Sequence, residues 1–112
     1  MATKRCKPCE RGTAPLSRAQ AEGYLEELPG WQLSPDAKSI FREYLMKNFT
    51  SAIQLVGEIA QVAESEDHHP DLHVTGYRKL RIDLATHSIG GLSENDFILA
   101  AKIDALPKSL KP

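Results

Sequence analysis

The 112-residue sequence has no long apolar run, and aromatic residues make up only 6% of it. No stretch approaches the roughly 18 apolar residues that a membrane-spanning helix needs. The first ten residues lack the apolar centre of a secretory signal, so we expect a reducing compartment, most simply the cytoplasm. Fourteen Lys and Arg face fifteen Asp and Glu, and no basic run is long enough to follow a phosphate backbone. We therefore expect neither a membrane nor nucleic acid as a direct partner.

Cysteine is also scarce, because Cys6 and Cys9 are the only two. They form a Cys-Lys-Pro-Cys motif, which is half of a zinc site, and no second pair completes it nearby. A thioredoxin-like role would need the motif between a strand and a helix, but it lies in a stretch rich in Lys, Gly and Pro. We interpret residues 1–14 as a tail that is unstructured or locally packed, and residues 15–112 as one domain. A metal or redox function of the pair is the open alternative.

The periodicity of the apolar residues predicts three helices and four strands. The strongest strand signal lies at 78–86, where Leu80, Ile82 and Leu84 alternate with Arg81 and Asp83. A capping box of Ser17 and Gln20 begins the first helix, which Pro29-Gly30 ends, and Ser93 caps the last helix. Short links between consecutive strands favour antiparallel pairing, so we expect an α+β domain with the helices on one face of the sheet. The expected order is helix 18–28, strands 31–33 and 39–46, helix 50–64, strands 72–75 and 78–86, and helix 94–106.

Polar residues that could carry chemistry collect between positions 64 and 96. The pair His68-His69 follows the second long helix, and His87 follows the last strand. Side chains of adjacent extended residues point in opposite directions, so we expect the paired histidines to have different roles. Near pH 7 a charged imidazole can donate a proton while a neutral one accepts it. This segment therefore predicts an acid–base site.

Each of these residues also has a simpler structural explanation. The histidines could be ordinary loop residues, and Thr86 an ordinary strand residue. Asp96 follows Ser93 by three positions, where an acid stabilises the first turn of a helix. Tyr77 could only pack. A metal site built from the four histidines, His73 included, with nearby carboxylates is a less favoured alternative.

The spacing of Glu64, His68-His69-Pro70, Tyr77, His87 and Asp96 resembles the signature of the pterin-4a-carbinolamine dehydratases. The text around it, Asp-His-His-Pro-Asp-Leu-His and Thr-His-Ser-Ile-Gly-Gly-Leu-Ser-Glu-Asn-Asp, is similar to the bacterial, plant and protist branch of that family. The likeness covers roughly residues 16–106. It implies a four-stranded antiparallel sheet with three helices on one face, a homodimer or homotetramer, and no metal or other cofactor.

The resemblance also implies an activity, that of a 4a-hydroxytetrahydrobiopterin dehydratase. Such a hydro-lyase removes water from 4a-hydroxytetrahydropterin to give quinonoid dihydropterin, which recycles the pterin used by aromatic amino acid hydroxylases. By resemblance, His68 and His87 are the acid–base pair, and their roles exchange between substrate stereoisomers. The resemblance also implies supporting roles. His69 and Asp67 would hold the pterin, with backbone contacts near Ala85 and Thr86. Glu64 would orient a histidine or tune its charge, and Asp96 would support the site from the last helix.

The same resemblance leaves a second class of function open, that of an interaction protein. Animal relatives bind a homeodomain transcription factor as dimerisation cofactors, and plastid relatives with altered sites assist assembly of a carbon-fixing enzyme. Retention of His68, His69 and His87 favours catalysis, since a pure scaffold does not need them. Compared with the animal branch, one extra residue lies between His-His-Pro and the next strand, which makes the role of Tyr77 less certain.

Overall fold

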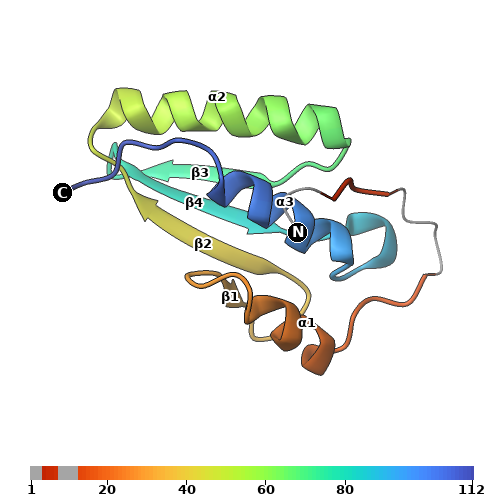
Figure 1. Ribbon diagram of the computed structural model, residues 1–112. Coiled ribbons are helices and arrows are strands. Elements are labelled where there is room, and N and C mark those ends of the chain that lie inside the picture. Colours follow the sequence, from red (N-terminus) through yellow and green to blue (C-terminus); the bar gives the residue numbers. More distant parts are fainter. Residues whose placement is uncertain (1–3, 8–12) are drawn as a thin grey trace.

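The computed structural model describes residues 4–7 and 13–112. Its helices and strands follow the predicted order, with one short 3₁₀ helix, η1, that the periodicity did not predict (Figure 1). The elements are α1 (Arg18–Leu25), β1 (Gln32–Leu33), β2 (Ile40–Leu45), α2 (Phe49–Glu66), β3 (Asp71–Thr75), β4 (Lys79–Leu84), η1 (His87–Ile89) and α3 (Glu94–Asp104).

The four strands form one antiparallel sheet in the order β1-β2-β4-β3. The central strand β4 pairs with β2 along six residues and with β3 along five. Strands β2 and β3 are not neighbours, because β4 lies between them. The connection from β2 to β3, which contains α2, therefore passes over one face of the sheet (Figure 1). The predicted α+β fold with a four-stranded antiparallel sheet is confirmed.

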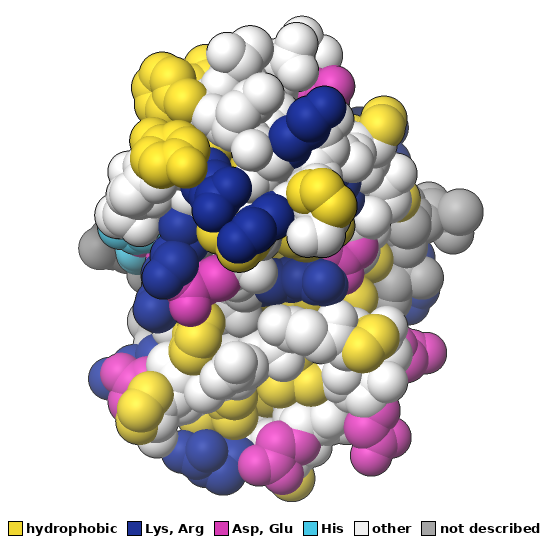
Figure 2. Space-filling view, turned by 90° about the vertical axis from the view of Figure 1, so that its left-hand side faces the viewer, with side chains coloured by type: hydrophobic (Ala, Val, Ile, Leu, Met, Phe, Trp, Pro, Cys, Tyr) yellow, Lys and Arg dark blue, Asp and Glu magenta, His cyan; other side chains and the backbone are white. Residues whose placement is uncertain are grey.

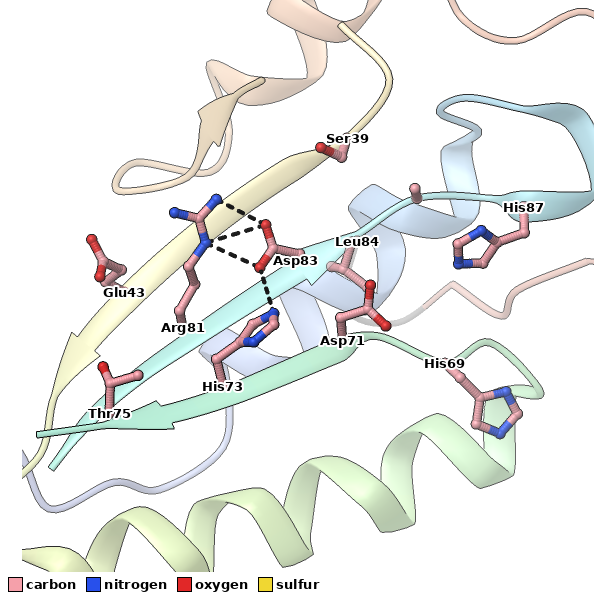
Figure 3. Close-up of a pocket in the computed structure, with 11 residues that line it drawn as sticks. Ser39, Glu43, His69, Asp71, His73, Thr75, Arg81, Asp83, Leu84 and His87 are labelled. Atoms are coloured by element: carbon pink, nitrogen blue, oxygen red, sulfur yellow. Dashed lines mark hydrogen bonds and ion pairs between the residues drawn. The ribbon is translucent and has the colours of Figure 1, made fainter. Parts of the chain in front are cut away.

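The two faces of the sheet differ in chemistry. Leu80, Ile82 and Leu84 of β4 are at most 1% exposed, and they belong to the core beneath the helices. Their neighbours Arg81 and Asp83 point to the opposite face, where both are only half-buried (Figure 3). The period-two alternation along β4 therefore produces one buried apolar face and one open polar face.

The first helix begins as predicted but ends early. Ser17 and Gln20 form the expected capping box, whereas α1 stops at Leu25 instead of continuing to Leu28. After Leu25 the chain forms a tighter turn. The amide of Leu28 donates to the carbonyl of Leu25 at 3.0 Å, and this bond between residues three positions apart is typical of a 3₁₀ turn. Leu28 is nevertheless buried, so the turn preserves its place in the core.

A polar cluster at the end of α3 ties that helix to the first two strands. The Asp104 carboxylate accepts hydrogen bonds from Trp31 Nε1 at 2.9 Å and from the Tyr44 hydroxyl, and it pairs with Arg42 Nη1 at 3.2 Å. Burial, together with the bond to Asp104, raises the pKa of Tyr44 above its usual value. The cluster satisfies buried polar groups that would otherwise be costly, and the sequence did not predict it.

Candidate active site

The site begins where α2 ends. Asp67 has a left-handed backbone (φ 51°), and the amide of His68 donates to the carbonyl of Ala63 at 3.1 Å. A left-handed residue is a common way to end a helix, and Asp adopts it more readily than most residues other than glycine. The reversal places the paired histidines differently, since the side chain of His68 is 11% exposed and that of His69 is 58% exposed. The two side chains thus differ in environment, and the expectation that they have different roles stays a prediction.

His68 contacts a buried carboxylate from a distant part of the chain. Its Nε2 lies 2.6 Å from Asp96 Oδ1, and the side chain of Asp96 is fully buried. A carboxylate accepts hydrogen bonds, so the imidazole Nε2 is the donor. In the neutral ring this leaves Nδ1 without a proton and able to accept one. A hydrogen bond to one ring nitrogen that fixes the tautomer in this way is common for histidines that act in catalysis.

The other oxygen of Asp96 organises the start of α3. Asp96 Oδ2 accepts from the amide of Ser93 at 3.0 Å and from the hydroxyl of Thr86 at 2.8 Å. The Thr86 oxygen in turn lies 2.7 Å from the Ser93 hydroxyl. The simpler explanation of Asp96 as a helix cap is therefore correct but incomplete, because one oxygen caps α3 and the other holds His68.

His69 has a partner of a different kind. Its Nε2 lies 2.9 Å from Glu64 Oε2, and the two side chains are 58% and 76% exposed. Both residues lie at the end of α2 or just after it. A contact this exposed contributes little to stability, so it serves mainly to restrict the orientation of the ring.

A cavity of about 220 Å³ brings the predicted residues together. The paired histidines enter it from the end of α2, and His87 enters it from the first position of η1. Asp96 and Glu64 do not line it, but they contact two residues that do, His68 and His69 respectively. The residues that line the cavity are Asp67, His68, His69, Ala85, Thr86, His87 and Ser88, of which only Ser88 was not predicted.

A larger cavity of about 580 Å³ adjoins the first on the open face of the sheet (Figure 3). The two share His69, Ala85 and His87. At its base, Arg81 makes a two-pronged contact with Asp83, and His73 Nε2 lies 3.4 Å from the same carboxylate. The alternation of β4 predicted that Arg81 and Asp83 share a face. It could not place His73 beside them, because that contact depends on the register of β3 against β4.

Tyr77 lines neither of these two cavities. It occupies the turn between β3 and β4 with a left-handed backbone (φ 57°), and it is 59% exposed. Asp71 pairs with Asp83 at one end of this hairpin, whereas Thr75 pairs with Lys79 at the end that carries Tyr77. The smaller cavity, with His69 and His87, lies at the first of these ends, and the larger one also extends along the sheet to Thr75.

The metal alternative finds no support in the part of the chain that the structure describes. Within residues 4–7 and 13–112, no three side chains of His, Cys, Asp or Glu are grouped so that they could hold a metal ion. Cys9 lies outside the described residues, so the structure does not test the role of the Cys-Lys-Pro-Cys motif. Among the described helices, none combines the length and apolar character needed to cross a bilayer.

A family model described as "Pterin 4 alpha carbinolamine dehydratase" matches residues 14–106. The chain belongs to this family. A relative from Halorhodospira halophila, provisionally named pterin-4-alpha-carbinolamine dehydratase, is 50% identical over 103 residues, which are 92% of this chain and 94% of the relative. The resemblance inferred from the spaced histidines and acids is thus confirmed at the level of the family.

Two solved structures of pterin dehydratase type have the same fold. One is described as a transcriptional coactivator/pterin dehydratase from Brucella melitensis. It has a TM-score of 0.76 and 33% identity, covering 81% of this chain and 96% of the other. The second is a pterin dehydratase-like protein described as a RuBisCO assembly factor in the alpha-carboxysome. It has a TM-score of 0.60 and 19% identity, covering 73% and 94%, so it supports the fold alone.

Proposed function

We propose that this member of the pterin carbinolamine dehydratase family removes water from a 4a-hydroxytetrahydropterin to give the quinonoid dihydropterin. One observation carries the proposal. Imidazoles from two separate parts of the chain, His68 after α2 and His87 at the start of η1, line a single cavity. Family membership supplies the substrate class, and the cavity supplies groups suited to its chemistry.

The reaction needs one proton donor and one proton acceptor. The C4a–O bond breaks and the departing hydroxide takes a proton from an acid, so that water leaves. N5 gives up its proton to a base, and the electron pair of the N5–H bond forms the C4a=N5 double bond. Each positioned acid or base contributes typically about 10² to 10⁴-fold to a rate.

We assign the acid and base roles to His68 and His87. Asp96 holds Nε2 of His68, so Nδ1 is the nitrogen left to exchange a proton with the substrate, and the buried carboxylate stabilises the imidazolium that forms when Nδ1 accepts a proton. His87 is exposed and can exchange its proton with water after each turnover. The two roles exchange between substrate stereoisomers, because each places the hydroxyl group on a different face of the pterin.

The remaining residues of the cavity would hold the flat ring. Ala85 and Thr86 lie just beyond Leu84, where the β2–β4 ladder ends, and both line the cavity. This supports the proposal that the pterin contacts the chain here, although the amide of Thr86 itself donates to the carbonyl of Gly91 at 2.8 Å. His69 and Asp67 close the cavity from the end of α2. Glu64 limits the freedom of His69 through their contact at 2.9 Å.

A stopped-flow absorbance assay on chemically generated 4a-hydroxytetrahydropterin tests the proposal. The wild-type protein should accelerate dehydration above the spontaneous rate, and His68→Ala should remove most of that acceleration. His73→Ala is a matched control, since His73 does not line the smaller cavity. Dehydration at the spontaneous rate with the wild-type protein would contradict the proposal.

We also propose that the protein forms a homodimer or homotetramer. Supporting this, large apolar side chains are exposed near the end of β2 and the start of α2, namely Leu45 (44%), Phe49 (54%) and Ile53 (45%). Figure 2 shows hydrophobic side chains among Lys and Arg on this end of the molecule. Sedimentation equilibrium should detect the oligomer, and Phe49→Ser should weaken it. Recycling for an aromatic amino acid hydroxylase and a cytoplasmic location stay predictions.

A second candidate function is that of an interaction or assembly protein on the same fold. The Brucella relative is described both as a transcriptional coactivator and as a pterin dehydratase, which favours testing both in this chain. Affinity capture with the wild-type protein and with His68→Ala separates the two functions. If the protein is a scaffold, the wild type and His68→Ala should capture the same partner. If it is an enzyme, His68→Ala should lose its dehydratase activity.

A further inference from the structure

Part of the N-terminal tail is packed against the domain at the point where α2 ends and α3 begins. We propose that the segment Lys4–Lys7 is a positioning element of the active site, which holds the two helix ends that carry His68 and Asp96. This inference rests on the proposed dehydratase function for its kinetic consequence. Its structural consequence, the position of the His68 ring, can be measured without any assay of activity.

The segment contacts the last residue of α2. The amide of Cys6 donates to Glu66 Oε1 at 2.8 Å, and Arg5 Nε pairs with Glu66 Oε2 at 3.0 Å. A further bond of 3.4 Å runs from Arg5 Nη2 to the carbonyl of Ser65. The side chain of Glu66 is only 4% exposed, so the segment supplies partners for a carboxylate that has little access to water. Glu66 is followed by Asp67 and then by His68.

The same segment contacts the start of α3. The amide of Lys7 donates to Asn95 Oδ1 at 2.8 Å, and Asn95 Nδ2 donates back to the carbonyl of Lys7. The side chain of Asn95 thus pairs with the backbone of the segment as a neighbouring strand would. Asn95 is 7% exposed and directly precedes Asp96, which is fully buried.

These contacts join the two parts of the chain that carry His68 and its partner Asp96. His68 and Asp96 are 28 positions apart, and their ring-to-carboxylate distance is 2.6 Å. The segment holds Glu66 on one side and Asn95 on the other, so it limits the separation of the helix ends. It also lines a cavity of about 420 Å³ that shares Asp67, His68, Thr86 and Ser88 with the smaller site cavity. A misplacement of about 1 Å in such a site can cost about 10²-fold in rate.

The electrostatics of the contact favour a docked segment at neutral pH. The amide of Cys6, helped by nearby Lys102 and Arg5, lowers the pKa of Glu66, so this carboxylate stays ionised. Burial and the neighbouring Glu66 raise the pKa of the Cys6 thiol to about 12. The thiol therefore stays neutral and does not add a second negative charge beside Glu66.

Proline substitutions in the full-length protein test the inference, since proline removes a backbone donor. Cys6→Pro deletes the bond from its amide to Glu66 Oε1, and Lys7→Pro deletes the bond from its amide to Asn95 Oδ1. Cys6→Ala is the matched control, because it keeps the amide and removes the thiol, a weak donor whose contact with the Asn95 carbonyl is 3.6 Å long. No residue of the segment belongs to the buried apolar core, so the domain should stay folded in every variant.

We expect both proline variants to lower kcat at least fivefold with less than a twofold change in KM. In ¹⁵N-edited NMR spectra of the histidine rings they should also weaken or lose the hydrogen-bonded Nε2–H signal of His68. Cys6→Ala should match the wild type in both measurements. A purely structural role of the segment would change the unfolding temperature and leave the His68 signal as it is.

Three results would overturn the inference. They are proline variants with wild-type kcat and His68 signal, a loss of kcat with an unchanged His68 signal, or an equal loss in Cys6→Ala. If the wild-type protein proves to have no dehydratase activity, the proposed function fails alone. The His68 signal in the same variants then still decides whether the segment positions the ring.

Discussion

Replacing Asp96 with Asn is the change that separates structural support from catalysis most clearly. Asp96 accepts hydrogen bonds from the Ser93 amide, the Thr86 hydroxyl and His68 Nε2. An Asn of the same shape can keep its carbonyl oxygen toward Ser93 and Thr86. Its amide NH₂ group then faces His68 and donates to Nε2. The neutral ring must consequently carry its proton on Nδ1, and this nitrogen can no longer accept a proton from the substrate stereoisomer for which His68 is the base.

The size of each effect follows from the contacts. The charge-assisted bond to His68 becomes a neutral one, and the first turn of α3 loses a negative charge. Together these changes should cost about 1 to 2 kcal/mol of the free energy of unfolding. Loss of a positioned base should lower kcat by about 10²-fold or more. The variant is thus expected to be folded and nearly inactive.

The assay combines stopped-flow dehydration with chemical denaturation and ¹⁵N NMR of the histidine rings. Glu94→Gln is the matched control, because Glu94 lies in the same first turn but contacts the Tyr24 hydroxyl at 2.9 Å instead of His68. The control should lose about 0.3 to 1 kcal/mol and keep its turnover. Wild-type kcat in Asp96→Asn, or retention of the Nε2–H tautomer of His68, would refute the reasoning.

His87→Ala should leave the unfolding temperature within a few degrees of wild type, because the side chain is exposed, yet lower dehydration at least tenfold; unchanged turnover would remove His87 from the mechanism. Asp67→Gly should keep or slightly raise the stability and Asp67→Ala should lose about 1 kcal/mol, since only glycine adopts φ 51° without strain. Both variants should raise KM, and a wild-type KM would exclude a contact with substrate. Asp104→Ala should lower the free energy of unfolding by about 3 kcal/mol, because it leaves buried donors unpaired, with unchanged kcat; a large kcat loss would contradict a purely structural role. The Tyr24 hydroxyl lowers the pKa of Glu94, so its contribution is present above the unfolded value of 4.5 and is lost as the pH falls through the folded value. Tyr24→Phe should accordingly flatten the acid side of the stability curve measured by urea unfolding, and an unchanged curve would count against this linkage.

Local sequence patterns predicted most of the fold. The alternation of Leu80, Ile82 and Leu84 located the central strand, and the capping residues Ser17 and Ser93 located two helix starts. These signals are local, since they depend on the period of a strand or on a bond between residues three positions apart. The early end of α1 was missed because propensity alone does not determine the last turn of a helix.

The features that could not be predicted depend on contacts between distant residues. His73 meets Asp83 through the register of two strands, and Asn95 meets the N-terminal segment across 88 positions. Resemblance supplied the members of the site, including Asp96, but not the geometry by which one carboxylate both caps α3 and holds His68. The assigned roles of the histidines stay predictions until they are tested.

The most direct test is a titration of the protein, labelled with ¹⁵N in its histidine rings, with a stable oxidised pterin. If one flat heterocycle occupies the space between the two imidazoles, the ring signals of His68 and His87 will both shift and will reach saturation at the same midpoint. A pterin that binds while leaving either ring unperturbed, or that perturbs the two with different midpoints, would contradict the account.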